Sequence, residues 1–285
     1  MNRLSLRVVC ALGIVFMTTL AFGQSKNKGM KASKKLGWEV ACQSYTFKNF
    51  TLEEAFSKMK ELGISNAEIY SRQKVSSSSD LTTNYASLAD NKDAILDLAK
   101  NNGIEVESYG VISGKDEASW VQIFEFCKAV GIEIIASEPD PKHYALIDSL
   151  CNAYSIRIAI HNHPNPTRYW NPNIVLDALE GRSKMMGACA DLGHWTRSGL
   201  DAAECLKKLE GRIFELHLKD VTGTTPDHKS IILGEGVIDF ESVLKELKRQ
   251  KFKGRFIVEY ETNWDDQMDD MRKNLEYFYS EVGKL

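Results

Sequence analysis

Two hydrophobic patterns alternate along the chain from about residue 38 to the end. Short segments with an apolar residue at every second position are typical of β-strands, and longer ones with apolar residues three or four apart are typical of helices. The first pattern predicts eight strands: Trp38–Thr46, Asn66–Ser71, Ile104–Ile112, Ile132–Glu138, Ile156–His163, Met185–Leu192, Ile213–Asp220 and Arg255–Glu261.

A helical pattern follows each predicted strand. Several of these helices end at a glycine that leads directly into the next strand, as at Gly63, Gly103 and Gly131, and glycine suits the left-handed position after a helix. The clearest helical segments are Leu52–Leu62, Ile95–Ala99, Trp120–Val130, Ala145–Cys151, Ile174–Leu179, Ala203–Leu209, Phe240–Leu247 and Met271–Val282.

Eight strand–helix units predict an α/β protein with a single (β/α)8 TIM-barrel domain over residues 37–285, since such a barrel needs about 250 residues. The competing fold is a doubly wound open sheet, which usually has a glycine-rich phosphate loop after its first strand. Residues 43–47 (Gln-Ser-Tyr-Thr-Phe) do not resemble such a loop. Two long connections, Arg72–Ala86 and Val221–Val237, are expected on the active-site face, although the serine run Ser76–Ser79 favours an ordinary surface loop.

The first 23 residues have the pattern of a secretory signal peptide. Arg3 and Arg7 precede an apolar segment, Val8–Phe22, that ends in small residues and predicts cleavage before Gln24. The segment is short for a membrane span, so an uncleaved anchor is the less favoured alternative. We therefore expect an exported, periplasmic or secreted protein without stable membrane insertion after cleavage, with a flexible lead over residues 24–36.

Composition narrows the classes of partner. The full chain has a net charge of −3, and loss of Arg3 and Arg7 leaves 34 basic and 39 acidic residues, a net charge of −5. An acidic chain argues against a nucleic-acid partner. The five remaining cysteines are an odd number without metal or redox spacing and are expected to be core residues. The sequence leaves open whether the chain forms a homo-oligomer.

Ionisable residues gather where several predicted strands end. In the seventh strand Glu215, His217 and Lys219 alternate with apolar residues that suit packing under helices. The fifth, sixth and eighth strands place ionisable groups in the same way. The resulting candidate metal ligands, one from each of four successive strands, are His161, Asp191, His217 and Glu259.

A divalent metal is the simplest partner for such a cluster, because buried charges are costly unless they are paired or bound to an ion. Two imidazoles and two carboxylates, with further coordination positions of the ion left open, suit Mn, Zn, Co or Fe better than Ca or Mg. An open position lets the ion polarise a substrate carbonyl or hydroxyl. The competing interpretation is a set of structural ion pairs, such as Glu215 with Lys219 or Arg157.

Further candidates surround these four residues. Glu138 closes the fourth strand and is open to three roles: ligand, base or helix entry. His163 and Lys219 are candidate proton carriers, and Gly193 permits a turn that brings His194 toward the pocket. Candidate rings for stacking on a sugar are Tyr109, Trp170 and Trp195, although packing is the default for any aromatic residue.

Four motifs together resemble the xylose-isomerase-like sugar isomerase/epimerase superfamily. They are Asp191-Leu192-Gly193-His194, Glu215-Leu216-His217-Leu218-Lys219-Asp220, Gly234-Glu235-Gly236-Val237-Ile238-Asp239-Phe240 and Val258-Glu259-Tyr260-Glu261. The resemblance implies a barrel with one divalent ion held by Glu, Asp, His and Glu from strands five to eight. Asp191, His217 and Glu259 fall on the last three of these positions. His161 stands where the family usually has its first Glu.

This departure affects the expected reaction. The resemblance implies an isomerase or epimerase in which two glutamates move a proton next to a carbonyl through an enediolate. With His161 in place of one of them, the proton on that face must go to Glu138, His163 or Lys219. A one-sided base suits an elimination, so a 3-keto-glycoside lyase is the close alternative. Export favours an unphosphorylated sugar, keto-sugar or glycoside as substrate, since phosphorylated sugars are cytoplasmic.

Two other classes are less favoured. The superfamily includes apurinic-site endonucleases, and Asp227-His228 faintly resembles their additional ligands, but the second and third strands end in Tyr70-Ser71 and Tyr109-Gly110 rather than in histidine. A non-catalytic periplasmic sugar-binding protein would have no need of the metal ligands.

Overall fold

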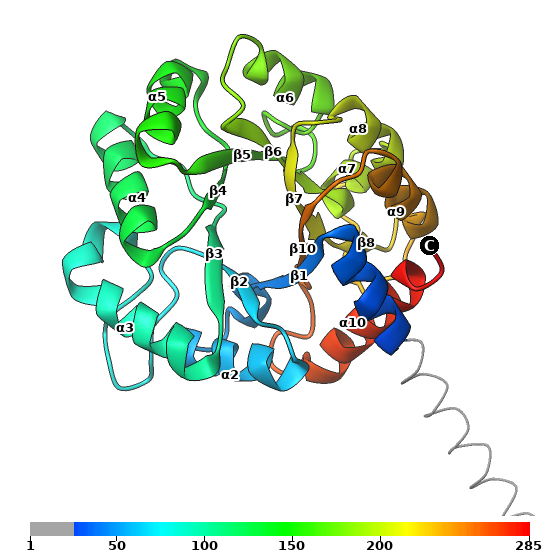
Figure 1. Cartoon of the computed structure of the whole chain (residues 1–285), viewed down its shortest axis with the longest axis horizontal. Helices are drawn as coiled ribbons and strands as arrows, with labels where there is room; N and C mark the ends of the chain where they lie inside the picture. The colour runs from blue at the N-terminus through cyan, green and yellow to red at the C-terminus, as the bar shows by residue number, and fades with distance from the viewer. Residues whose placement is uncertain (1–25) are drawn as a thin grey trace, which may run out of the picture.

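The eight predicted strands form one closed parallel barrel, as seen in a computed structural model that describes residues 26–285 (Figure 1). The predicted signal peptide, residues 1–23, lies outside the described residues. The strand order around the barrel is β1-β10-β7-β6-β5-β4-β3-β2. The strands are β1 (Trp38–Gln43), β2 (Asn66–Ile69), β3 (Glu105–Tyr109), β4 (Ile134–Ser137), β5 (Arg157–His161), β6 (Met186–Asp191), β7 (Ile213–Leu218) and β10 (Gly254–Val258). The predicted (β/α)8 fold is confirmed.

Helices follow the strands and form the outer ring of the barrel (Figure 1). Thr51 and Glu54 make a reciprocal capping box at the start of α2, and Gly63 ends this helix with a left-handed φ of 75°. The helices are α2 (Leu52–Leu62), α3 (Leu88–Asn102), α4 (Glu117–Val130), α5 (Tyr144–Tyr154), α6 (Pro172–Leu179), α7 (Leu192–Arg197), α8 (Ala202–Lys208), α9 (Phe240–Arg249) and α10 (Met268–Val282), with short 3-10 turns η1 (Ser44–Phe47), η2 (Tyr85–Ser87) and η3 (Pro141–His143).

The predicted strands are too long at their carboxyl ends. Six of the eight overrun the observed strand by two or three residues there, and the residues beyond the strand form the loops that carry the candidate site. The helix α7 was not predicted. It is six residues long, too short to show a helical period, and all six residues are buried.

Residues 26–36 form a helix, which corrects the expected flexible lead over residues 24–36. The helix docks on α10, because an added Cβ at Gly29 would lie 1.8 Å from the backbone oxygen of Tyr279. Ser33 Oγ donates a hydrogen bond to the Trp38 carbonyl at 2.7 Å, which ties the helix to β1. The hydrophobic pattern does not predict this helix, because the segment contains five lysines and few large apolar residues.

Both long connections are ordered by buried polar groups. In the first, Thr83 Oγ1 accepts from the Gln73 backbone N–H at 2.9 Å, and Val75 is buried. In the second, a two-stranded ribbon forms from β8 (Asp220–Val221) and β9 (Ser230–Ile231). The Asp220 carboxylate accepts backbone hydrogen bonds from Gly234, Gly236 and Ile238. These bonds hold the end of the connection against β8, at its beginning.

Two further observations concern the described part of the chain. Within residues 26–285, no helix is both long enough and apolar enough to cross a membrane. The five cysteines in this part are free and buried, which confirms the expectation that they are core residues.

The docking of the first helix yields a stability prediction. We expect Gly29→Ala to lower the free energy of unfolding by about 1–3 kcal/mol, because the added methyl group overpacks the contact with Tyr279. The control is Lys31→Ala on the exposed face of the same helix. Urea denaturation measures both variants. Equal stability of the two would show that the helix does not pack on α10.

Candidate functional site

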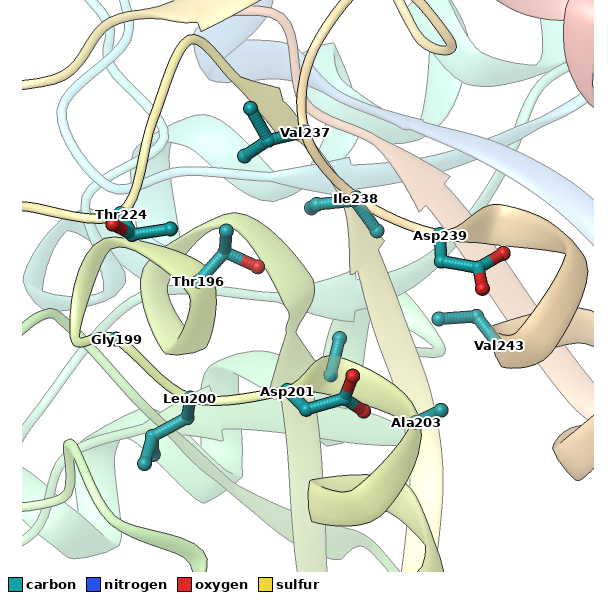
Figure 2. Close-up of a pocket in the computed structure, with 11 residues that line it drawn as sticks. Thr196, Gly199, Leu200, Asp201, Ala203, Thr224, Val237, Ile238, Asp239 and Val243 are labelled. Atoms are coloured by element: carbon teal, nitrogen blue, oxygen red, sulfur yellow. The ribbon is translucent and has the colours of Figure 1, made fainter.

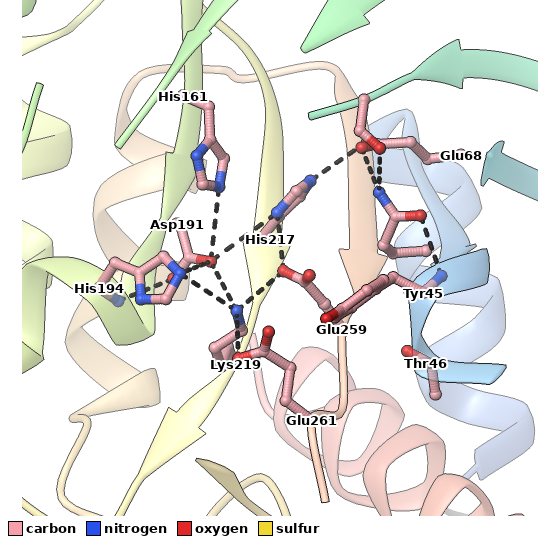
Figure 3. Close-up of polar contacts among 12 residues, drawn as sticks. Tyr45, Thr46, Glu68, His161, Asp191, His194, His217, Lys219, Glu259 and Glu261 are labelled. Carbon is pink, nitrogen blue, oxygen red and sulfur yellow. Dashed lines mark hydrogen bonds and ion pairs between the residues drawn. The ribbon is translucent and has the colours of Figure 1, made fainter. Parts of the chain in front are cut away.

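The four predicted metal ligands meet at the carboxyl end of the barrel (Figure 3). His161 and Asp191 end β5 and β6, His217 lies in β7 and Glu259 follows β10. Asp191 and His217 are register partners on neighbouring strands. All four residues are buried, with exposed fractions of 8% or less. The fold therefore brings together the side chains that the sequence assigned to one site.

One buried atom of each of these four side chains makes no well-aligned hydrogen bond and contacts other ionisable groups of the site instead. These buried atoms are His161 Nε2, Asp191 Oδ2, His217 Nδ1 and Glu259 Oε2. His161 Nε2 lies 3.7 Å from Asp191 Oδ2, and His217 Nδ1 lies 3.8 Å from the same oxygen and 3.0 Å from Glu259 Oε2. Bond lengths of 2.0–2.1 Å in a tetrahedral zinc site give ligand separations of roughly 3.3 Å. Asp191 belongs to two groups of three residues whose ligand atoms lie within 4.8 Å of one another, one with His161 and His194 and one with His217 and Glu259, and either group could hold a divalent metal.

Asp191 divides its two carboxylate oxygens between two tasks. Oδ1 accepts a hydrogen bond from the His194 backbone N–H at 2.8 Å and caps α7, while Oδ2 faces the other ligands. This cap also explains why α7 starts directly after β6. The pKa of Asp191 lies well below its ordinary value, because the cationic and imidazole groups around it outweigh the effect of burial.

Each imidazole ligand has a carboxylate at its other nitrogen. His161 Nδ1 lies 3.1 Å from Glu138 Oε1, and His217 Nε2 lies 3.2 Å from Glu68 Oε2. Glu68 was not predicted as a site residue. The available signal was an acidic residue between the buried residues Ala67 and Ile69 of a short strand.

Lys219 lies between three carboxylates. Its Nζ is 3.2 Å from Asp191 Oδ2, 2.9 Å from Glu259 Oε2 and 2.9 Å from Glu261 Oε2. Burial lowers the pKa of Lys219, but these three anions raise it above the ordinary value. Lys219 is therefore a protonated ammonium at neutral pH. The alternative pairing of Lys219 with Glu215 is not observed, because the Lys219 ammonium pairs with these three carboxylates instead.

Glu138 links two histidines, His161 and His163. Its Oε1 contacts Nδ1 of both His161 and His163. Burial alone would raise the pKa of Glu138, but the hydrogen bonds and charges of the two histidines lower it to about 2. These three groups satisfy one another, so they form a hydrogen-bonded cluster rather than a second set of unpaired ligands. The His163 side chain is 44% exposed and faces solvent.

His194, a candidate substrate-binding residue, lies beside these side chains. Its Nε2 lies 3.5 Å from Asp191 Oδ2 and 3.4 Å from Lys219 Nζ. Burial, with Lys219 nearby, holds the pKa of His194 well below its ordinary value despite the attraction of Asp191. His194 is therefore a neutral imidazole beside the ligands.

The fold agrees with comparisons to known proteins. The family described as "Xylose isomerase-like TIM barrel" matches residues 56–281. The chain belongs to this family.

Two curated relatives match shorter segments. An Escherichia coli protein provisionally named L-ribulose-5-phosphate 3-epimerase is 36% identical over 73 residues, which are 24% of this chain and 26% of the relative. Inosose dehydratase from Clostridium perfringens is 33% identical over 86 residues, 25% of this chain and 29% of the relative. The chain spans well under half the length of the curated relatives it matches.

Solved structures match nearly the whole barrel. An uncharacterized protein from Parabacteroides distasonis has a TM-score of 0.69 and 34% identity, covering 85% of this chain and 98% of the other. The IolI protein with a bound zinc atom has a TM-score of 0.67 and 16% identity, covering 86% and 98%. The second similarity concerns the fold alone.

The predicted sugar-stacking rings are mostly core residues, which corrects that expectation. Tyr109 is fully buried, packs against Phe126 and donates its hydroxyl hydrogen bond to the Thr83 carbonyl. Trp195 is 1% exposed within the hydrophobic core. Trp170 is half-buried and stays a prediction. Packing and ligand stacking use the same ring surfaces, so the sequence pattern alone does not separate them.

Aromatic residues that the sequence did not single out lie where β1 and β2 end and after β10. Tyr45 contacts Tyr70 and Trp264 edge-on, with ring centroids 5.2 and 5.6 Å apart. All three rings are half-buried.

A separate surface pocket next to α7, α8 and α9 includes Thr196, Asp201 and Asp239 but none of the four candidate ligands (Figure 2). It is therefore distinct from the candidate metal site.

Glu215 yields a pH prediction. Burial and the neighbouring Glu68 raise the pKa of Glu215 to about 7, so the folded state favours the protonated acid. Protonation of Glu215 therefore contributes to the free energy of unfolding in acid, and this contribution is lost as the pH rises through about 7. The free energy of unfolding falls by at most about 1.4 kcal/mol per pH unit from this cause. Glu215→Gln stays neutral. We expect the variant to gain stability relative to the native protein from pH 5 to pH 8.

Urea unfolding in the presence of a chelator, repeated at pH 5, 6, 7 and 8, measures this difference. Parallel stability profiles for the native protein and Glu215→Gln would contradict the raised pKa.

Proposed function

We propose that the protein is a divalent-metal-dependent sugar isomerase or epimerase that removes a proton next to a carbonyl group. The proposed substrate is an unphosphorylated sugar or keto-sugar, and the proposed location is outside the cytoplasm. The observation that carries the proposal is the convergence, from four successive strands, of four buried atoms that can bind a metal and that make no well-aligned hydrogen bond. The names of the two relatives, an epimerase and a dehydratase, support proton abstraction as the common step.

The metal would be held by His161, Asp191, His217 and Glu259. When bound, a divalent ion such as Mn, Zn, Co or Fe supplies Lewis-acid stabilisation of negative charge on a substrate oxygen. The zinc atom named for the IolI structure supports a metal in this family, and the identity of the ion in this chain is part of the proposal.

His163 is the proposed base. Its Nδ1 is held by Glu138, so the tautomer with hydrogen on Nδ1 presents Nε2 as the proton acceptor. The Glu138 carboxylate then stabilises the imidazolium that forms when His163 takes the substrate proton. The exposure of His163 at the mouth suits contact with a substrate, whereas His161 is almost fully buried.

The second candidate reaction is elimination from a 3-keto-glycoside. This reaction needs a base and a separate acid. His163, held by Glu138, is the candidate base, and the Lys219 ammonium is the candidate acid. The base would take the proton beside the ketone, and the Lys219 ammonium would give a proton to the departing oxygen on the next carbon. An epimerase needs proton carriers on both faces of the substrate, with Glu259 as the second carrier.

Metal content tests the core of the proposal. We expect about one transition-metal ion per chain in the native protein and loss of most of it in Asp191→Asn, because the variant loses a charged ligand. Asp201→Asn at the exposed N-cap of α8 is the matched control and keeps its metal. Elemental analysis after dialysis measures all three. Absence of metal from the native protein, even after metal is added back, would point to a non-catalytic sugar-binding barrel.

The two reactions are distinguished in heavy water. With keto-sugars and methyl 3-keto-glucoside as probes, deuterium uptake without methanol release identifies an isomerase or epimerase, and methanol release identifies a lyase. We expect His163→Asn to slow either reaction by about 10²–10⁴-fold while the metal stays bound. His228→Asn on the β8–β9 ribbon is the control. Unchanged rates in His163→Asn would exclude His163 as the base.

A further inference from the structure

His217 presents its two ring nitrogens to different surroundings. Nδ1 faces Asp191 and Glu259, and Nε2 faces Glu68 (Figure 3). Without an ion, carboxylates stand at both nitrogens of His217. A metal ligand needs a bare nitrogen toward the ion, so a divalent ion at Nδ1 would leave the one hydrogen of a neutral imidazole on Nε2. The group at Nε2 must then accept that hydrogen.

Glu68 is held in one orientation by Gln43. The Gln43 Nε2 amide donates to Glu68 Oε1 and, at 3.0 Å, to the Gly110 carbonyl. The Gln43 Oε1 atom accepts from the Tyr45 backbone N–H at 3.2 Å. Two acceptors at one end and a donor at the other allow only one orientation of this amide. Gln43 thus directs its NH2 group, and no acceptor, at Glu68.

We propose that Gln43 and Glu68 form a positioning pair that fixes the tautomer of His217 with hydrogen on Nε2 and the lone pair on Nδ1. The pair lies on β1 and β2, while His217 lies in β7, so the hydrogen bond to Glu68 crosses the barrel interior. The proposal rests on the metal site proposed above. Carboxylates of this kind behind a ligating histidine typically change metal affinity about 10- to 100-fold.

Glu68 differs from Glu138, the carboxylate behind His161. Glu138 is 20% exposed and also binds His163, so it belongs to the proposed proton path. Glu68 is completely buried, and its hydrogen bonds go to Gln43 and His217. A residue in this position does not reach a substrate at the mouth. Glu68 is therefore a positioning residue.

Replacement of Glu68 by glutamine has a specific chemical consequence. In Glu68→Gln, the new carbonyl oxygen must accept from the Gln43 amide, which turns the new NH2 group toward His217 Nε2. That NH2 group donates, so Nε2 becomes an acceptor and the hydrogen moves to Nδ1, where it blocks the metal. The double variant Gln43→Glu with Glu68→Gln reverses the donor and acceptor and returns a carbonyl oxygen to His217 Nε2.

Two measurements test the pair. Long-range ¹H–¹⁵N NMR of histidine-labelled, Zn²⁺-loaded protein reports which nitrogen of His217 carries hydrogen, with His217→Ala used for assignment. Competition with a chromophoric chelator reports the dissociation constant for Zn²⁺. We expect Glu68→Gln to switch the tautomer and weaken Zn²⁺ binding at least about 10-fold. The double variant recovers the native tautomer and part of the affinity, because the carboxylate introduced at position 43 cannot donate to the Gly110 carbonyl.

Glu215→Gln is the matched control, because Glu215 is equally buried in the barrel and bonds Ser108 rather than an imidazole. Equal weakening by Glu215→Gln and Glu68→Gln would show that any substitution in the barrel interior weakens Zn²⁺ binding, and no recovery of the tautomer in the double variant would show that hydrogen-bond direction does not matter. Either result would overturn the positioning role. A native His217 with hydrogen on Nδ1 would overturn it as well. Failure of the native protein to bind Zn²⁺ would instead overturn the metal site.

Discussion

The structure depends on how buried charge is compensated at the mouth of the barrel. The two carboxylates and two imidazoles that converge there are nearly inaccessible to water, and each keeps one atom without a well-aligned hydrogen bond. Polar atoms in such a position cost free energy unless a partner is supplied. Lys219 supplies one positive charge at ion-pair distance from the two carboxylates, and Glu259 Oε2 lies 3.0 Å from His217 Nδ1. A divalent cation, as proposed, would give all four atoms a common partner.

The two halves of the barrel contribute differently to this arrangement. The strands β5, β6, β7 and β10 carry the ligands, and β1 and β2 carry the pair Gln43 and Glu68 that holds His217 from behind. Proton transfer is assigned to the outer, partly exposed groups Glu138 and His163. Ligand positioning is assigned to groups that water does not reach. In this proposal, the residues that transfer protons are partly exposed, and the residues that orient the metal ligands are buried.

The barrel and the clustering of the candidate ligands were predictable for one physical reason. Strand alternation places every second residue inside the barrel, so His217 could be assigned to the interior and Asp191 to a strand end before the fold was known. The residue Glu68 was missed because one acid in a four-residue strand gives no alternating pattern. The helix over residues 26–36 was missed because its docking depends on the shape of Gly29 rather than on hydrophobicity. Tyr109 and Trp195 were wrongly offered for sugar stacking because a ring suits a core as well as a ligand.

The most direct test of the central claim is anomalous X-ray scattering from crystals of the full barrel soaked in Co²⁺, measured on both sides of the cobalt edge. The account predicts one strong peak within bonding distance of His161 Nε2, Asp191 Oδ2, His217 Nδ1 and Glu259 Oε2. A peak between Glu138 and His163 instead, or no peak near these side chains, would contradict it.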